Sequence, residues 1–193
     1  MVRMVDAIPE RPLPPPLGDG CALFLDVDGT LVDFDPDPSA IRIPPQVRDA
    51  IGRIAARLGG AVALVSGRTL EQLDALFAPL RLPAAGVHGH QFRGSGEAAT
   101  AIPGDTSAFL HELHREALHL AHAHPGVRVE HKGVSLALHW RAAPHAAAAV
   151  LDFAGSRVAG LPGYRLQPGD HVVEFVPAAS DKGRAVQRML AEP

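Results

Sequence analysis

The sequence has little of what marks secreted, membrane-bound or nucleic-acid-binding proteins. A single cysteine, Cys21, excludes an internal disulfide framework and favours a reducing compartment. No apolar run approaches the ~20 residues that a membrane-spanning helix needs. The net charge of -3 over 193 residues gives no reason to expect nucleic acid or an anionic membrane as a partner. Together these absences predict a cytoplasmic protein.

The chain begins with a segment rich in proline and then alternates strands with helices. Residues 1–20 carry prolines and acids where a secretory signal peptide would be apolar, and we interpret them as a flexible Pro-rich tail. Residues 21–90 alternate short apolar runs with amphipathic segments, which predicts a parallel sheet with helical crossovers. We expect strands at 21–26, 61–68 and 84–89, and helices at 44–58 and 69–80. Cys21 would open the first strand as a small core residue.

From residue 91 the pattern becomes that of an α+β insert. Alternating apolar and polar positions mark antiparallel strands with one exposed face. We expect a helix over about 105–124, strands at 127–131 and 134–140, an alanine-rich helix over about 145–157, and a hairpin of 164–167 with 171–176. Residues 91–176 therefore form a predicted second domain. Residues 177–193 return to the first domain with a helix that Ser180 or Asp181 caps.

Two carboxylates end the first predicted strand, in the stretch ALFLDVDGT. Asp26 and Asp28 would share a face of an extended strand or converge on one point, and they repel each other unless a cation or a proton lies between them. Mg²⁺ suits such oxygen ligands. The alternative is an acidic turn at Asp28 and Gly29, but the apolar strand in front and Thr30 behind favour the metal site.

Polar groups also follow the other predicted strands. Ser66 and Gly67 end the second strand, where a hydroxyl and free backbone N–H groups can hold phosphoryl oxygens or simply cap the next helix. Lys182 at the start of the last helix is either a solvated charge or a phosphate ligand aided by the helix amino terminus. Reactive groups of parallel sheets gather at the carboxyl ends of the strands, which is where Asp26, Ser66 and His88 are expected.

Asp-x-Asp-Gly-Thr-Leu after one strand, Ser-Gly-Arg after the next and a distant lysine resemble three motifs of the haloacid dehalogenase-like phosphohydrolase superfamily. The resemblance implies an α/β fold, a Rossmann-like parallel-sheet core with an inserted α+β cap of the C2 type. It implies that Asp26 is the nucleophile that becomes phosphorylated, that Asp28 is the general acid and base, and that both bind Mg²⁺. Ser66, Gly67 and Lys182 would then bind the phosphoryl group.

The stretch VEHKGVSLALHWR, with GVHG before the insert and VVEFVPAASDKGRAV after it, is similar to the trehalose-6-phosphate phosphatase family. The resemblance covers roughly residues 20 to 190. It implies a disaccharide site built from Glu130, Lys132, Arg141 and Glu174. Arg68 and His88 are two further candidate substrate-binding residues.

The sequence leaves the roles of three further residues undecided. His139 could bond to sugar or support Arg141, and the residues alone favour neither. The family more usually has Ala-Glu after the His-Gly pair, whereas this chain has His90 and Gln91. The role of that corner of the sugar site is therefore left open.

The implied reaction is Mg²⁺-dependent hydrolysis of trehalose 6-phosphate to trehalose and phosphate, which places the protein in trehalose biosynthesis beside trehalose-6-phosphate synthase. The alternatives are a phosphatase for sucrose-phosphate or mannosylphosphoglycerate with the same cap, and a phosphosugar-binding protein without turnover. The superfamily's fourth, acidic motif completes the metal site, and the sequence reaches Pro193 before it. We therefore expect little turnover from these 193 residues and an exposed edge for the strand at 22–25.

Histidines crowd the helix predicted near 105–124. They are His111, His114, His119, His122 and His124. No cysteine joins them, and a solvated helix face is favoured over a metal site.

Overall fold

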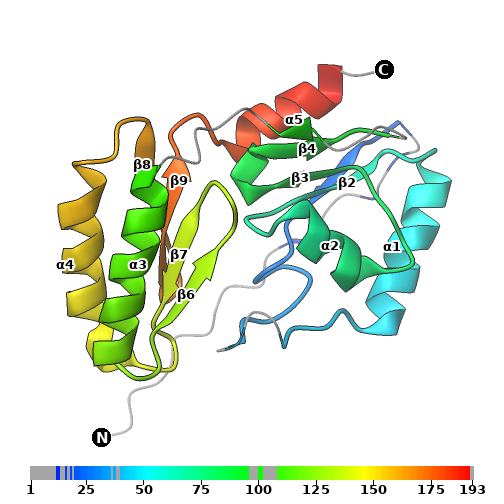
Figure 1. The fold of residues 1–193 in the computed structure, drawn as a ribbon. Helices are drawn as coiled ribbons and strands as arrows, with labels where there is room; N and C mark the ends of the chain where they lie inside the picture. Colours follow the sequence, from blue (N-terminus) through cyan, green and yellow to red (C-terminus); the bar gives the residue numbers. More distant parts are fainter. Residues whose placement is uncertain are drawn as a thin grey trace, which may run out of the picture.

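A computed structural model describes the chain in two lobes, each built on its own sheet (Figure 1). The described residues are 12, 13, 16, 18, 20–35, 37, 40–95, 100–101 and 108–191. The predicted tail and the predicted start of the helix near residue 105 therefore lie largely outside the described residues. No helix in the described part is long and apolar enough to cross a membrane.

The first lobe contains a five-stranded sheet in the order β1-β2-β3-β4-β5. The strands are β1 (Leu23–Leu25), β2 (Val62–Val65), β3 (Ala84–Gly86), β4 (Gln91–Arg93) and β5 (Thr100–Ala101). The first three are parallel, as predicted, and the last two are antiparallel. Because β4 folds back onto β3, the first sheet continues beyond residue 91, where the sequence pattern places the start of the second lobe.

Helices cover both faces of this sheet. α1 (Pro45–Arg57) and α2 (Leu70–Phe77) lie on one face and α5 (Lys182–Ala191) on the other. Successive strand residues point to opposite faces, so Leu64 packs into the core with α1 and α2, whereas Val65 packs against Ala185 of α5. The carboxyl ends of the strands are therefore open to the second lobe.

β1 is an edge strand of the first sheet. Among the described strands it pairs with β2 alone, and its three residues are only partly buried, whereas β2 is fully buried. The expected exposed edge is confirmed. Cys21, in contrast, is exposed and not a core residue, because β1 begins two residues later at Leu23.

The second lobe is an antiparallel sheet in the order β6-β7-β9-β8, backed by two helices. Its elements are α3 (Ala108–Ala123), β6 (Arg128–His131), β7 (Leu136–His139), α4 (Ala147–Val158), β8 (Tyr164–Gly169) and β9 (Val172–Pro177). Leu136, Leu138 and Trp140 pack into the core that α3 and α4 cover. α3 and α4 lie on the side of the sheet that points away from the first lobe (Figure 1). The other face of the sheet therefore looks toward the strand ends.

Candidate active site

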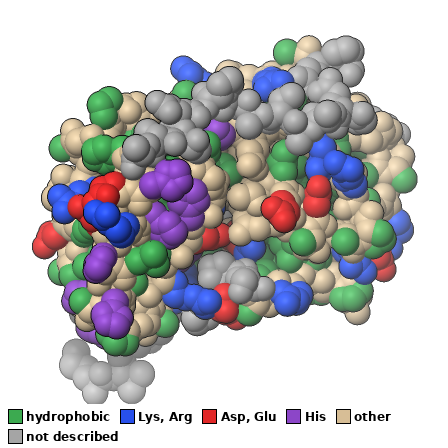
Figure 2. All heavy atoms as spheres, in the orientation of Figure 1, with side chains coloured by type: hydrophobic (Ala, Val, Ile, Leu, Met, Phe, Trp, Pro, Cys, Tyr) green, Lys and Arg blue, Asp and Glu red, His purple; other side chains and the backbone are tan. Residues whose placement is uncertain are grey.

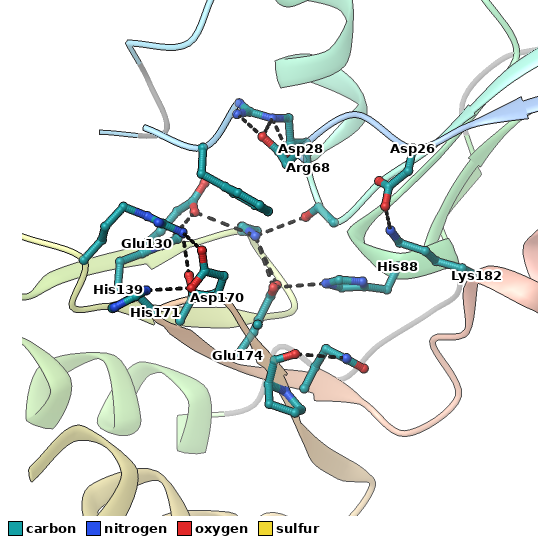
Figure 3. Close-up of a pocket in the computed structure, with 18 of the residues that line it drawn as sticks. Asp26, Asp28, Arg68, His88, Glu130, His139, Asp170, His171, Glu174 and Lys182 are labelled. Carbon is teal, nitrogen blue, oxygen red and sulfur yellow. Dashed lines mark hydrogen bonds and ion pairs between the residues drawn. The ribbon is translucent and has the colours of Figure 1, made fainter. Parts of the chain in front are cut away.

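A cleft of about 510 Å³ lies between the strand ends of the first lobe and the open sheet face of the second. Every site residue predicted from the sequence lines it except Ser66, which is fully buried. Figure 3 shows side chains from both lobes pointing into this cleft. The predicted motifs, which are scattered over the sequence, therefore meet at one place.

Asp26 and Lys182 face each other on the first-lobe side of the cleft. The Lys182 ammonium donates to Oδ2 of Asp26 over 2.7 Å, and the other carboxylate oxygen accepts the N–H of Val27 at 2.8 Å. Lys182 opens α5, whose N-terminus is capped by Oδ1 of Asp181 accepting the N–H of Arg184. Of the two predicted caps, Asp181 is the one observed. Lys182 therefore stands where a phosphoryl group on Asp26 would need positive charge.

Asp28 is bound by Arg68. The guanidinium contacts both carboxylate oxygens, with Nη2 at 2.7 Å from Oδ1 and Nε at 3.0 Å from Oδ2. This is a bidentate, charge-assisted pair, the strongest class of side-chain hydrogen bond. Arg68 is itself 91% buried. In this structure Arg68 therefore neutralises Asp28, although the sequence assigned it to substrate.

The loop after Asp28 turns sharply at Gly29. Its φ of +77° lies in the left-handed region, and a Cβ there would come within 2.8 Å of the Phe34 ring. The turn brings Phe34 back to the cleft, where half of its side-chain surface stays exposed. An exposed ring therefore lies beside the predicted catalytic loop.

The loops after β2 and β3 pack tightly on each other. Oγ of Ser66 accepts the N–H of Arg68 at 3.1 Å, so this hydroxyl supports the turn from below the cleft surface. A Cβ on Gly67 would lie 2.7 Å from the His88 ring. Val87 and His88 both have positive φ, +47° and +54°, which a non-glycine residue adopts only when its surroundings enforce it. This strained pair presses the imidazole against Gly67 and turns it toward the second lobe.

Lys132 and Glu174 join the two lobes at the middle of the cleft. The Lys132 ammonium lies 3.2 and 3.3 Å from the two oxygens of Glu174 and donates to the backbone oxygen of Gly67 at 3.1 Å. Glu174 also binds Oγ of Ser135 at 2.7 Å and Nε2 of His88 at 3.1 Å. Burial alone raises the pKa of the Glu174 carboxyl, but the His88 hydrogen bond and the Lys132 charge outweigh it and leave the pKa below its usual value. Glu174 is therefore an ionised acceptor.

Glu130 is a second ionised carboxylate at the cleft. Oε1 accepts Nε2 of Gln72 at 2.8 Å, Oε2 binds Nε2 of His139 at 3.0 Å, and the Lys132 ammonium is 3.7 Å away. Burial raises the pKa of Glu130, but the His139 hydrogen bond, the Lys132 charge and the Gln72 hydrogen bond together lower it to about 2. His139 therefore supports Glu130 and not Arg141.

Arg141 follows β7 and bonds to Asp170, which lies between β8 and β9. Nη2 donates to the backbone oxygen of Asp170 at 2.9 Å and to its Oδ2 at 2.7 Å. The guanidinium carbon is 5.0 Å from the centre of the Phe34 ring, within cation–π range. Arg141 thus contacts both lobes.

Sequence reasoning missed three residues that hold the predicted ones. The role of Gln72 in helix capping could be predicted, because Thr69 and Gln72 form a capping box at the start of α2. No local pattern indicates that the Gln72 amide also bonds to Glu130. In the sequence, Asp170 is indistinguishable from an ordinary hairpin-turn residue, and Phe34 is an isolated apolar residue in a predicted loop. Each acts through a contact distant in sequence.

His90 and Gln91, left open by the sequence, do not line the cleft. Gln91 Oε1 accepts the N–H of Leu70 at 2.8 Å and so completes the N-terminus of α2. His90 is 2% exposed, and neither ring nitrogen bonds to any described residue; burial lowers its pKa, which favours the neutral ring. The pair packs the first lobe.

Histidine side chains gather over α3, and Figure 2 shows them as a patch on the face of the second lobe. The rings of His111 and His114 lie 6.2 and 5.1 Å from that of His131 on β6. Within the described ranges no group of three His, Cys, Asp or Glu side chains is arranged to hold a metal ion. His111, His119 and His122 are exposed, as a solvated helix face requires.

The chemistry of Asp26 and Asp28 suits Mg²⁺, since both are carboxylates at the edge of an open cleft. Each is paired with a cation here, Lys182 and Arg68 respectively. Two carboxylates are only part of an octahedral ligand set. They fit the ion in kind, and binding it requires at least partial release from their partners.

Residues 24–193 match the trehalose-phosphatase family. The chain is 36% identical over 178 residues to a probable trehalose-phosphate phosphatase of Sinorhizobium fredii, and 35% identical over 184 residues to the trehalose-6-phosphate phosphatase of Escherichia coli. These alignments cover 91% and 92% of this chain, which spans 66% of the length of each relative.

The fold is similar to that of the C-terminal domain of C. albicans trehalose-6-phosphate phosphatase, with a TM-score of 0.80 and 21% identity, covering 90% of this chain and 63% of that one. The predicted α/β fold, a parallel-sheet core with an inserted α+β lobe, is thereby confirmed. On its motifs, its cleft and these alignments, the chain belongs to the trehalose-phosphatase family.

Proposed function

We propose that the protein hydrolyses trehalose 6-phosphate with Mg²⁺ through a phosphorylated Asp26. The observation that carries this proposal is the layout of the cleft. The pair of Asp26 and Lys182 lies on one side, while Glu130 and Glu174 of the second lobe face it as ionised hydrogen-bond acceptors. A phosphate ester with a large polyhydroxylated leaving group matches both sets of groups.

In the proposed reaction, a carboxylate oxygen of Asp26 attacks phosphorus while the bond from phosphorus to the sugar oxygen breaks. Asp28 must first leave its ion pair with Arg68 and take up a proton, which it would then give to that oxygen before taking a proton from the water that hydrolyses the aspartyl phosphate. Lys182, 2.7 Å from Asp26, stabilises charge on the phosphoryl oxygens. Gly67 shapes the phosphate side of the cleft. Mg²⁺, held by Asp26 and Asp28 when bound, supplies further positive charge.

The sugar hydroxyls would be bound by side chains that are already ionised and held in place by the protein. Lys132 donates, and Glu130 and Glu174 accept, so hydroxyls can both give and receive hydrogen bonds. Because these side chains are largely buried and positioned by the protein, little entropy is lost on binding. A hydrogen-bonding site of this kind discriminates sharply against ligands that lack the matching hydroxyls.

A substrate panel tests this proposal. Phosphate release is measured from trehalose 6-phosphate, sucrose 6-phosphate and glucose 6-phosphate, with Mg²⁺ and with a chelator. The expected turnover of these 193 residues is low, but trehalose 6-phosphate should have the highest kcat/KM of the three and the chelator should abolish release. Faster hydrolysis of sucrose 6-phosphate would assign the protein to another sugar phosphate.

A second candidate is phosphosugar binding without turnover. It is favoured by one observation: Asp26 and Asp28 are both engaged by cations, and the described ranges offer no third His, Cys, Asp or Glu to complete a metal group. Calorimetric binding of trehalose 6-phosphate together with undetectable phosphate release would support this candidate over the first.

The cellular setting follows from the same proposal. The substrate would come from a reaction that joins two glucose units and leaves a 6-phosphate, the reaction of trehalose-6-phosphate synthase. We also propose a cytoplasmic location, since the lone thiol of Cys21 is exposed and free.

A further inference from the structure

A two-residue turn holds Arg141 in place. Gly169 and Val172 pair across the β8–β9 hairpin, so Asp170 and His171 form its turn. His171 has φ of +56°, Nδ1 of its ring lies 2.6 Å from Oδ1 of Asp170, and its backbone oxygen accepts the N–H of Trp140 at 2.9 Å. The turn is thereby fixed to the end of β7, directly before Arg141.

Asp170 uses its two carboxylate oxygens for two different partners. Oδ1 binds His171 and Oδ2 accepts Nη2 of Arg141, while the Asp170 backbone oxygen accepts the same Nη2. The Arg141 side chain is 23% exposed, whereas that of Asp170 is 49% exposed. The turn therefore fixes one edge of a guanidinium that is itself mostly covered.

The face of the same guanidinium rests on the first lobe. Its carbon lies 5.0 Å from the Phe34 ring centre, and that ring sits against Gly29, next to Asp28. Arg141 is thus held at one edge by the second lobe and on one face by the catalytic loop of the first. Arg141 therefore bridges the two lobes across the cleft.

Arg141 keeps donors for a ligand. Nε and Nη1 form no hydrogen bond with any of the described residues, and Arg141, Asp170 and Phe34 all line the cleft. In Figure 3, Asp170 and His171 lie on the opposite side of the cleft from Asp26 and Lys182. Because Asp170, which binds Arg141, lies across the cleft from Asp26 and Lys182, we expect these donors to face the part of a ligand beyond its first sugar ring.

We propose, in a step that rests on the proposed function, that Asp170 is a positioning residue. Together with Phe34 it orients Arg141 so that the guanidinium binds the second sugar ring of a disaccharide phosphate. Asp170 itself does not touch the reacting atoms. Its effect should appear in the affinity for ligands with a second ring and be absent for a monosaccharide phosphate. The hydrogen-bond geometry of Arg141, not its charge alone, is what the turn supplies.

Calorimetry tests this in an Asp26→Asn background, which prevents turnover during titration. The probes are trehalose 6-phosphate and glucose 6-phosphate. Asp170→Asn should weaken trehalose 6-phosphate binding about 5- to 10-fold, the scale of one ordinary hydrogen bond, and change glucose 6-phosphate binding less than about 2-fold. Phe34→Leu should act in the same direction. Asp152→Asn, an exposed carboxylate on α4, is the matched control and should change neither.

A double variant separates positioning from general destabilisation. In Arg141→Gln protein, adding Asp170→Asn should cause no further loss of trehalose 6-phosphate binding, because the group it positions is gone. Equal losses of affinity for both probes would overturn this inference but not the proposed function. A full additional loss of affinity on top of that of Arg141→Gln would do the same. If the Asp26→Asn protein binds the two probes equally, the proposed disaccharide function fails, and this inference fails with it.

Discussion

Lys132 and Glu174 form a buried ion pair at the meeting point of the two lobes, with the ammonium 3.2 Å from Oε1 of the carboxylate and 3.1 Å from the backbone oxygen of Gly67. The two side chains are only 8% and 7% exposed. Residues expected to read sugar therefore also bind the phosphate-side loop when no sugar is present. Substrate must compete with contacts that the protein already makes to itself.

Glu174→Gln should destabilise the protein as well as weaken sugar binding. The amide leaves the buried Lys132 ammonium without its anion, and losing one partner of such a pair costs about 3–5 kcal/mol of unfolding free energy. Urea unfolding at pH 7 measures this. Glu112→Gln on the exposed face of α3 is the control and should cost less than about 0.5 kcal/mol. A loss below 1 kcal/mol for Glu174→Gln would show that the pair is solvated.

Stability should fall in acid partly through Glu130. Its pKa in the fold is about 2, below the ordinary 4.5, so its contribution is present above pH 4.5 and is lost as the pH falls from 4.5 toward 2. The difference corresponds to at most about 3 kcal/mol. In Glu130→Gln protein, unfolding free energies measured across this range should fall less steeply than in the unsubstituted protein. Parallel curves would mean that Glu130 titrates normally.

Gly67→Ala should act through His88. The added Cβ would come within 2.7 Å of the ring, forcing the imidazole away from Glu174 at a cost of about 1–3 kcal/mol. With His88→Ala already present, the same change should cost much less, because the obstructing ring is absent. Unfolding free energies of the two single variants and the double variant form the cycle. Additive losses would place the strain in the backbone instead.

The order of strands and helices could be predicted because its signals are local. Apolar runs predicted β1 and β2, and the helical spacing of Val47, Ile51 and Ile54 predicted α1. β4 and β5 could not be predicted, since two or three residues carry no period and β4 is defined by pairing back on β3.

The candidate site divides in the same way. Asp26, Lys132 and Lys182 could be proposed as site residues because each belongs to a short motif. The pairing of Arg68 with Asp28, and of Gln72 with Glu130, depends on how chain segments 40 and 58 residues apart approach each other. No local pattern encodes such distances, so partners of site residues were harder to predict than the residues themselves.

The central claim is that Asp26 is the residue that carries the phosphoryl group. An aspartyl phosphate can be trapped by mixing the protein with trehalose 6-phosphate and Mg²⁺, quenching, and reducing with borohydride, which converts the acyl phosphate to homoserine. Mass spectrometry of the peptide containing residues 22–30 then reads position 26. We expect homoserine at position 26, none at position 28, and neither label nor phosphate release in Asp26→Asn protein. Undiminished phosphate release by Asp26→Asn would contradict the proposed mechanism.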